Sequence, residues 1–592
     1  MGRFLFGVHC HQPVGNFEWV IKKVTEISYK PFLETIGRFP EVKFTLHYSG
    51  ILYEFFEKHW KEFFDLVGEM IERRQVEILS GGFYEPILPV IPEDDALEQL
   101  GMMNEYIEKR FGVKPRGIWL SERVWEPHLP SLLKKAGIEY TIVDEYHFTS
   151  CGWRVEDLTF PFITENNGDR ICIFPISKTL RYLVPFREID EVVNYIKGVE
   201  GCAILADDGE KFGSWPGTYD RVYKERWLER FLERLIKEGI ETSTFATALD
   251  DFPKKGPCYL PPASYEEMTE WCLPTEERER VEELKHDENL SKFIKGGFFR
   301  NFFVKYPEAN QLHKRMIYVS ERIKDKGKKY LFMGQCNCAY WHGIFGGLYL
   351  PHLRSAVYEN LIRAEREENL NKEEVEVLDF DADGKIEVIL TNENLKMFIS
   401  PEDGGGIKEL DFYPAPFNFM AVLTRRREAY HRFLGRSESF DGRKTIHEVI
   451  TAKEKDLERY LRYDRERLLM FRDRENYRWV VEKNTVRLYG EKINKEYRLL
   501  PSGFEVEYEG EVETIIPVFL LSPGVEEHEY GIVFSENEKK IRMEITWEGV
   551  EEHSLEEIWT VSSSESGMER TFQGYLLHVK GRDLRVKILL RM

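Results

Sequence analysis

The N-terminal part of the chain alternates short apolar runs with longer segments whose apolar residues recur at helical spacing, such as YKERWLERFLERLIKEG at 223–239. This alternation is typical of parallel βα units. Seven or eight such units favour a closed (β/α) barrel over an open sheet. The apolar runs are FLFGV (4–8), KFTLHY (43–48), VEILS (76–80), GIWLS (117–121), YTIVD (140–144), ICIFP (171–175), CAILA (202–206) and, as a candidate eighth, STFAT (243–247).

Polar residues gather at the ends of these predicted strands. The C-terminal ends of barrel strands meet at one mouth, where catalytic groups lie. We therefore expect one shared site, although each of these residues taken alone could be an ordinary loop residue. The residues are His9, His11, His47, Ser80, Glu122, Asp144, Asp207 and Asp208.

The rest of the chain changes texture twice. Residues 276–374 read as helical, and from 375 onward short alternating strands with turn residues predict a β-sandwich. We predict an α/β protein with a (β/α)7-type barrel domain at 1–275, a helical domain at 276–374 that completes the active site, and a β-sandwich domain at 375–592. The Arg-, Glu- and Asp-rich segment 451–477 is expected to be a solvated, charged face.

Composition excludes several classes of partner. A net charge of −21 argues against binding to a nucleic-acid backbone. The sequence contains no long apolar run, so no membrane span is expected. The N-terminus reads as a first strand and not as a signal peptide. The eight cysteines form no disulfide framework, which favours a cytoplasmic protein with reduced thiols. The bias toward Glu, Lys and Arg is common in proteins from hot environments.

Two strand-end segments combine acids with tryptophans. Glu122 lies in WLSERVWEP at 119–127, and Asp207 and Asp208 begin DDGEKFGSWPGT at 207–218. Two carboxyl groups on different barrel strands can face each other, as cleavage of a glycosidic bond requires. Aromatic rings beside them suit the apolar faces of sugars and would raise the pKa of a proton donor. The alternative reading is that these are structural acids.

The chain resembles glycoside hydrolase family 57, the archaeal and bacterial α-amylase and 4-α-glucanotransferase group. The resemblance extends over about 350 residues in the family's motif order, and the C-terminal β region also fits. The motifs that carry it are HCHQPVGNF (9–17), VEILSGGFYEP (76–86), WLSERVWEP (119–127), DDGEKFGSWPGT (207–218), YEEMTEWCLP (265–274) and QCNCAYWHGIFGGLYLPHLR (335–354).

This resemblance implies a retaining mechanism with Glu122 as the nucleophile. It implies that Asp208 is the general acid/base, because the family's acid/base motif selects Asp208 over Asp207. By the same resemblance, His11, Glu77, Trp119, Glu210, Trp271 and Trp341 would line the sugar subsites, with Gln12, Trp215 and His342 as weaker additions. Many relatives carry Asn, His and Asp where this chain has Cys10, Ala206 and Cys338, which leaves the exact substrate open.

No metal or cofactor is expected. His9, Cys10 and His11 could suggest zinc, but alternating residues of one strand place Cys10 on the opposite face from the two histidines. We therefore predict that these histidines contact sugar. DFDADG at 379–384 resembles the start of a calcium loop, yet its twelfth position is Leu390, so a β-turn is the better interpretation.

The sequence thus predicts a 4-α-glucanotransferase that acts on α-glucans or maltooligosaccharides. A hydrolysing α-amylase, an inactive glycan-binding protein, and a metal-dependent deacetylase or mannosidase on a similar barrel remain alternatives. Donor and acceptor chain length, action on α-1,6 branches and a homodimeric state stay open. The glycine- and aromatic-rich segment 335–354 is expected to close over the barrel mouth, with Trp341 as a ring platform.

Overall fold

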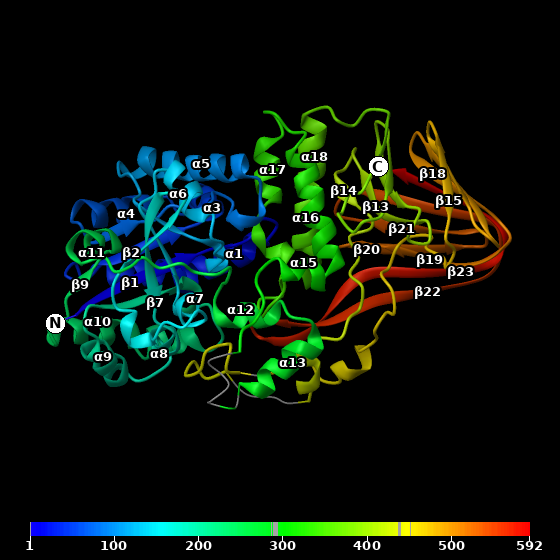
Figure 1. Cartoon of the computed structure of the whole chain (residues 1–592). Helices are drawn as coiled ribbons and strands as arrows, with labels where there is room; N and C mark the ends of the chain where they lie inside the picture. Colours follow the sequence, from blue (N-terminus) through cyan, green and yellow to red (C-terminus); the bar gives the residue numbers. More distant parts are fainter. Residues whose placement is uncertain (1, 286, 288–293, 436–439, 450) are drawn as a thin grey trace.

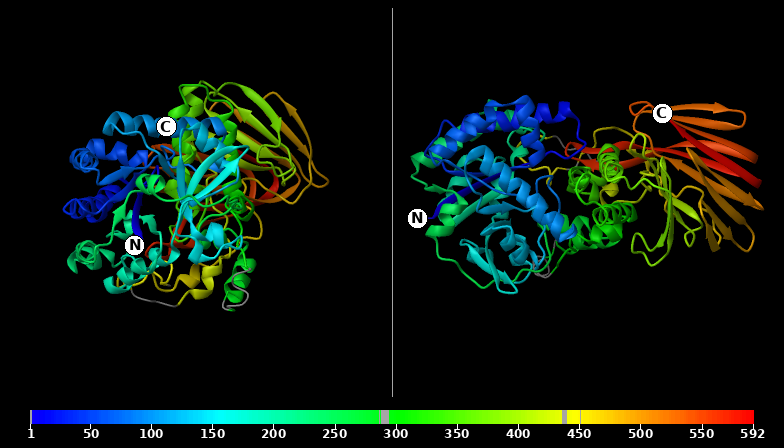
Figure 2. Two further views of the ribbon diagram at one scale, coloured as in Figure 1. Left: turned by 60° about the vertical axis from the view of Figure 1, so that its left-hand side comes forward. Right: turned by 90° about the horizontal axis from the view of Figure 1, so that it is seen from above.

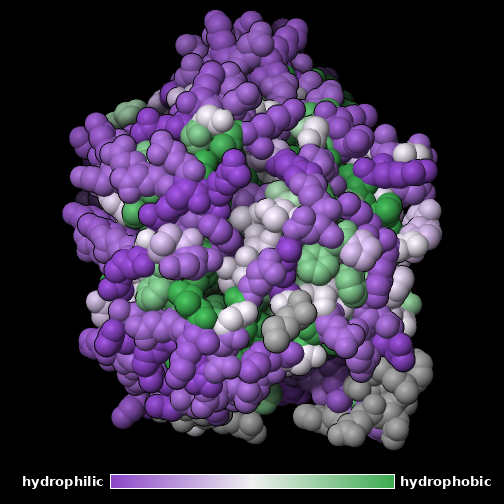
Figure 3. All heavy atoms as spheres, turned by 90° about the vertical axis from the view of Figure 1, so that its left-hand side faces the viewer, coloured by the Kyte–Doolittle hydropathy of each residue, from purple (hydrophilic) through white to green (hydrophobic). Residues whose placement is uncertain are grey.

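A computed structural model describes residues 2–285, 287, 294–435, 440–449 and 451–592. The barrel, a group of helices and two β-sheets follow one another along an elongated molecule (Figure 1). Seen from above, the helices lie between the barrel and the sheets (Figure 2). On the barrel side, hydrophilic residues predominate and the hydrophobic ones form separated patches (Figure 3), as expected for a chain with 32% charged residues.

Seven parallel strands form the barrel. They pair in the orders β3-β2-β1-β8 and β4-β5-β7. A parallel bridge between Ser80 and Ile118 joins the two groups on one side. On the other side, the Ser177 N–H donates to the Ile204 carbonyl at 2.9 Å and connects the end of β7 to β8. The strands are β1 (Arg3–Cys10), β2 (Phe44–Tyr48), β3 (Val76–Ile78), β4 (Gly117–Trp119), β5 (Tyr140–Asp144), β7 (Asp169–Ile176) and β8 (Cys202–Asp208).

The candidate eighth strand is wrong for most of its length. Only β9 (Thr242–Ser243) is extended, and it pairs with β1. The Thr244 side chain accepts a hydrogen bond from the Thr247 N–H, and α11 (Phe245–Asp251) starts there. A threonine at this position satisfies one of the free N–H groups of the first helical turn, so the segment turns into a helix.

Amphipathic helices surround the barrel. In α10 (Trp227–Lys237), the buried residues Trp227, Phe231 and Leu235 recur at helical spacing. β6 (Phe162–Asn166) pairs antiparallel with β7 outside the parallel set. The other helices of this region are α1 (Glu18–Val24), α2 (Lys30–Ile36), α3 (Gly50–His59), α4 (Glu62–Glu72), α5 (Glu93–Phe111), α6 (Leu129–Lys135), α7 (Glu145–Thr149), α8 (Lys178–Leu183) and α9 (Ile189–Gly198).

The middle of the chain is helical. Helix α12 lies beside the barrel mouth, and α16 and α18 stand between the barrel and the sheets (Figure 1). The helices are α12 (Glu266–Trp271), α13 (Thr275–Leu284), α15 (Asn301–Lys305), α16 (Pro307–Ser320), α17 (Lys328–Gly334) and α18 (Pro351–Glu367).

Two antiparallel sheets follow, and they share one hydrophobic core. The first holds β10 (Glu374–Leu378), β11 (Glu387–Thr391), β12 (Leu395–Ser400), β13 (Gly406–Phe412) and β14 (Phe417–Asn418). The second holds β15 (Arg478–Glu482), β16 (Thr485–Tyr489), β17 (Asn494–Leu500), β18 (Gly503–Glu509), β19 (Glu511–Val518), β20 (Pro523–His528), β21 (Gly531–Glu536), β22 (Ile541–Ser564) and β23 (Gly567–Arg591). The predicted fold class of barrel, helical region and C-terminal β-sandwich is confirmed.

The last two strands form an unusually long hairpin. β22 has 24 residues and β23 has 25, against about 5–6 in an average strand. In both views the hairpin runs from the C-terminal sheets toward the barrel (Figures 1 and 2).

The expected solvated face at 451–477 is wrong in part, because Leu457 packs under this hairpin against Val561 and Met568.

Candidate active site

A cavity of about 560 Å³ opens at the C-terminal ends of the barrel strands. Glu122 reaches it from the turn after β4, and Asp208 reaches it from the last position of β8. The barrel thus brings two acids 86 positions apart into one space. The predicted site residues that line this cavity are His11, Gln12, Glu122, Asp208, Glu210, Trp215 and Trp341.

Glu122 has an unusual backbone conformation. Its φ is 52° and ψ is 19°, in the left-handed region that glutamate rarely adopts. The Ser264 hydroxyl donates to its carbonyl, and the Tyr265 hydroxyl donates to its carboxylate at 2.9 Å. Burial and then the charge of Asp208 raise the pKa of Glu122 to about 7, whereas Arg123 and the tyrosine hydrogen bond favour its ionised form. Strained residues of this kind occur often at active sites.

The neighbouring acids Asp207 and Asp208 have opposite environments. Burial favours the neutral form of Asp207, but Lys211 at 2.6 Å, Arg181 at 3.5 Å and Arg123 hold the pKa of its carboxyl well below the usual value. Asp207 is therefore a fixed negative charge. For Asp208, burial and then the charge of Asp207 raise the pKa, so Asp208 retains a proton more readily.

Glu210 and His11 form a second polar contact on the cavity wall. The backbone N–H of His11 donates to the Glu210 carboxylate at 3.1 Å, and the Tyr29 hydroxyl donates to the same oxygen. Burial and the charge of Asp208 raise the pKa of Glu210 to about 8. Gln12 donates to the Tyr29 hydroxyl at 3.1 Å, which fixes the amide beside this pair.

A second cavity of about 350 Å³ adjoins the first, and two of the predicted site residues line it. Trp271 and His342 line it, together with Tyr430 and His447. Trp271 stacks on Trp341 of the first cavity, with ring centroids 6.2 Å apart and planes 9° apart. The paired rings therefore give each cavity a flat aromatic wall.

Trp119 lies behind the first cavity and not on its surface. It is 3% exposed and stacks on the His9 ring at 4.6 Å. His9 itself lines the cavity and contacts His47, with 2.8 Å between the Nδ1 atoms. Trp119 therefore supports a wall residue, and the structure does not place it where a sugar would touch it.

Glu77 does not reach either cavity. It belongs to β3 near the opposite end of the barrel, where its carboxylate accepts hydrogen bonds from Tyr140 at 2.5 Å and from the Ala246 N–H at 2.9 Å. The strand register pairs it with Thr45, the second residue of β2. These contacts make Glu77 a half-buried structural carboxylate, so its expected position in a subsite is corrected.

The acid of this motif that does approach the site is Glu85, which sequence reasoning missed. Glu85 has a φ of 57°, and its carboxylate is 3.7 Å from Nε2 of His9. Burial raises its pKa to about 8. The sequence could have pointed to Glu85, because the motif VEILSGGFYEP contains both Glu77 and Glu85. Tyr265, Arg123 and Glu565 were also missed, because sequence spacing does not show that they converge.

Among the described residues, three groups have the donor types and spacing for a metal: His9, His47 and Glu85; His11, Cys336 and Cys338; and Asp379, Asp381 and Glu387. In the third group Lys408 already provides the cation, with Nζ at 2.9 Å from Asp381 and 2.8 Å from Glu387. Asp379 accepts two backbone N–H groups of its own turn, as the β-turn interpretation predicts.

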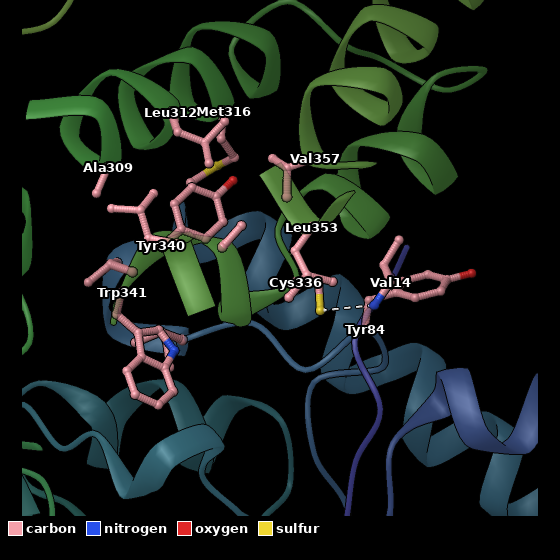
Figure 4. Packing of buried hydrophobic residues seen from close by; sticks show 14 of the residues in the cluster. Val14, Tyr84, Ala309, Leu312, Met316, Cys336, Tyr340, Trp341, Leu353 and Val357 are labelled. Carbon is pink, nitrogen blue, oxygen red and sulfur yellow. Dashed lines mark hydrogen bonds between the residues drawn. The ribbon is translucent and has the colours of Figure 1, made fainter. Parts of the chain in front are cut away.

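Segment 335–354 forms part of the cavity wall. Tyr340 and Cys336 insert into a core made by α16 and α18, while Trp341 points the other way (Figure 4). The Cys336 thiol accepts a hydrogen bond from the Val14 N–H at 3.5 Å. The Trp341 indole N–H donates to Asn337 at 3.0 Å. Cys336 and Tyr340 thus anchor the segment, and Trp341 faces the cavity.

A parallel barrel with paired carboxyl groups in an aromatic-walled cavity is typical of glycoside hydrolases. Comparison with protein families matches residues 5–261 to "Glycosyl hydrolase family 57". Residues 297–367 and 379–500 match the "Alpha-amylase/4-alpha-glucanotransferase" middle and C-terminal domains.

Relatives match over most of the chain. "Alpha-amylase 1" of Dictyoglomus thermophilum is 44% identical over 80% of this chain and 72% of its own length. "4-alpha-glucanotransferase" of Thermococcus litoralis is 41% identical over 86% of this chain and 80% of its own length. The crystal structure of a 4-alpha-glucanotransferase from the same organism superimposes with a TM-score of 0.89 and 35% identity, and the match covers 100% of both chains. This chain belongs to glycosyl hydrolase family 57.

Within the described residues, no helix is both long and apolar enough to cross a lipid bilayer.

Proposed function

We propose that this chain is a 4-α-glucanotransferase that moves maltooligosaccharide units between α-1,4-glucans by a retaining mechanism. Glu122 is the nucleophile and Asp208 is the general acid/base. The enzyme works in the cytoplasm, a proposal supported by cysteines that are all free.

One observation carries this proposal: Glu122 and Asp208 reach the same aromatic-walled cavity from the C-terminal ends of two different barrel strands. Two buried carboxyl groups in one cavity disfavour simultaneous ionisation. The Tyr265 hydrogen bond stabilises the anion at Glu122, although burial and the charge of Asp208 raise the pKa of this carboxyl. Asp207 raises the pKa of Asp208, and Arg123 lowers the pKa of both acids. A retaining enzyme needs one carboxyl group as nucleophile and a second as proton donor, about 5–5.5 Å apart, and a shared proton between two such groups meets this need.

The proposed reaction has two displacement steps. The Glu122 carboxylate attacks the anomeric carbon, the glycosidic C–O bond breaks, and the Asp208 proton passes to the leaving 4-oxygen. Asp208, now ionised, takes the proton of an incoming sugar hydroxyl. That oxygen attacks the anomeric carbon and releases Glu122. Net retention follows from the two inversions.

Hydrolysis by an α-amylase is the second candidate, because the 44% identical relative carries that name. The two activities share the covalent intermediate and differ in whether water or a sugar attacks it. Incubation with maltopentaose distinguishes them: a ladder of longer oligosaccharides with little gain in reducing ends indicates transfer, whereas accumulating reducing ends indicate hydrolysis.

The catalytic assignment is tested with a pair of variants. We expect Glu122→Gln to lower turnover at least about 10⁴-fold with the fold intact, since the nucleophile is lost. Asp208→Asn should impair natural glucans far more than an aryl maltooligoside, whose good leaving group needs little protonation. Glu105→Gln on the exposed face of α5 is the control. Near wild-type turnover of folded Glu122→Gln, or equal losses of Asp208→Asn on both substrates, would contradict the assignment.

A further inference from the structure

The turn of the β22–β23 hairpin extends from the C-terminal sheets to the active site. Glu565 and Ser566 form this turn, and both line the cavity that contains Glu122 and Asp208. Glu565 also lines the second cavity, beside Trp271 and His342. This acid, more than 350 positions after Asp208 in the chain, therefore lies at the junction of the two cavities.

The hairpin turn is held firmly in place. The Met568 N–H donates to the Thr451 carbonyl at 2.9 Å, and the Lys453 N–H donates to the Met568 carbonyl at 2.8 Å. At Gly567, where φ is 113°, an added Cβ would come within 2.7 Å of the Thr451 carbonyl, so only glycine permits this close approach. Segment 451–453 thus supports the turn through backbone hydrogen bonds and close packing.

The hairpin end packs on both sides. Val561 and Met568 form a small core with Leu457, and the Val561 carbonyl contacts Nε2 of His431 at 2.9 Å. A turn with this support presents its side chain at a defined place. Such fixed placement is what a binding residue requires, because a loose side chain would lose entropy on ligand binding.

The surroundings of Glu565 favour contact with hydroxyl groups. Burial raises the pKa of its carboxyl to about 7, Lys453 lowers it, and the charge of Asp208 raises it. A carboxyl group in this state can accept hydrogen bonds from neighbouring hydroxyls of a pyranose ring, or donate one when protonated. The second cavity supplies the flat apolar walls: Trp271 stacks with His447 at 5.8 Å, and Tyr430 bonds His342 at 2.9 Å.

We propose that Glu565 binds hydroxyl groups of the acceptor sugar and positions it between the two cavities for attack on the anomeric carbon. This inference rests on the proposed transfer function and adds a residue of the C-terminal domain to the substrate site. The second cavity then holds the acceptor chain, with the paired rings of Trp271 and Trp341 between acceptor and donor. A site built in this way favours sugar over water only while the hairpin turn is in place.

The test compares wild type with Glu565→Gln in the full-length chain. Maltopentaose serves as donor, and added glucose or maltose serves as acceptor at a series of concentrations. We expect the acceptor concentration for half-maximal transfer to rise about tenfold, with a larger fraction of donor lost to water. Glu552→Gln, an exposed site on the same hairpin, is the control and should match wild type.

Each result decides the question. Unchanged acceptor dependence in folded Glu565→Gln would overturn the role of Glu565, while the wild-type oligosaccharide ladder would still support transfer. The same holds if the melting temperature falls and acceptor dependence does not change, because the residue would then be structural. If wild type forms no ladder at any acceptor concentration, the transfer function fails first and the acceptor role fails with it.

Discussion

At the scale of single residues, the pair Asp207 and Asp208 shows how the charge of one acid raises the pKa of its neighbour. Asp207 is held ionised by three cations, and its charge raises the pKa of Asp208. The proton donor of a retaining enzyme must stay protonated until it is used. Asp207 is therefore a positioning residue that acts on Asp208 through the electric field and not through contact with substrate.

Asp207→Asn tests this link. Removing the negative charge lowers the pKa of Asp208, and the released cations lower it further. Activity that needs protonated Asp208 is lost as pH rises through that pKa, so the alkaline limb of kcat/KM should move to lower pH by about one unit. The measurement is a pH profile on maltopentaose, with exposed Asp65→Asn as control. An alkaline limb that stays in place or moves upward would refute the electrostatic role.

Residue types that follow strand ends could be predicted, but their depth in the barrel could not. Glu122 and Asp208 both end buried strands, and the general rule for barrels places them at one mouth. Glu77 and Glu85 lie eight positions apart in one motif, and the resemblance selected Glu77. The strand register decides which of the two acids reaches the cavity. β3 starts at Val76, so Glu77 lies at the N-terminal end of the strand, away from the barrel mouth. A short strand does not disclose its register in the sequence.

At the scale of elements, segment 335–354 combines an anchored part with a glycine-rich part that is itself mostly buried. Gly346 and Gly347 have positive φ values of 84° and 53°, and they turn the chain back toward α18. Trp341 is 3% exposed and lies between the two cavities. A ring in this position can exclude water from the intermediate and support a sugar acceptor.

We therefore expect Trp341→Ala to weaken transfer more than hydrolysis. Its effect is measured as the ratio of oligosaccharide ladder to new reducing ends from maltopentaose, after correction for folded enzyme. Trp547→Ala, in the C-terminal sheet, controls for the loss of a buried ring and should lower the melting temperature without changing this ratio. If Trp341→Ala lowers the melting temperature and leaves the ratio unchanged, Trp341 is only a core residue.

Elements with local signals were predictable, whereas long-range ones were not. The alternation of apolar runs predicts the barrel strands because each run and helix is one local unit. The β22–β23 hairpin reads as ordinary C-terminal strands, and its length becomes visible only from pairing across the whole hairpin. Contacts such as that of Thr451 with Met568 join residues more than 100 positions apart, which no local pattern encodes.

At the scale of the whole molecule, a buried charge network joins the helical middle to the first C-terminal sheet. Arg315 of α16 is fully buried and contacts Glu365 of α18, with Nη1–Oε1 2.9 Å. It also contacts Glu409 and Asp411 of β13, at 2.6 and 2.9 Å. Lys396 of β12 contacts Glu365 at 2.8 Å. Burial and the charge of Glu409 raise the pKa of Asp411 well above its usual value, so the three acids crowd their negative charge around two cations.

Arg315→Met should remove one of these two cations and leave the carboxyl groups buried without their main partner. Breaking a buried pair in this way costs about 3–5 kcal/mol, whereas Lys109→Met, which removes an exposed pair with Glu105, should cost at most about 0.5 kcal/mol. Calorimetry should show the helical middle and the sheets unfolding at lower temperature than the barrel, because the network joins α16, α18 and β13 and has no barrel residue. The hairpin turn that carries Glu565 is supported by those sheets. Acceptor dependence should therefore be lost below the temperature at which aryl maltooligoside cleavage stops. A single transition at the wild-type temperature would show that the network does not hold the two regions together.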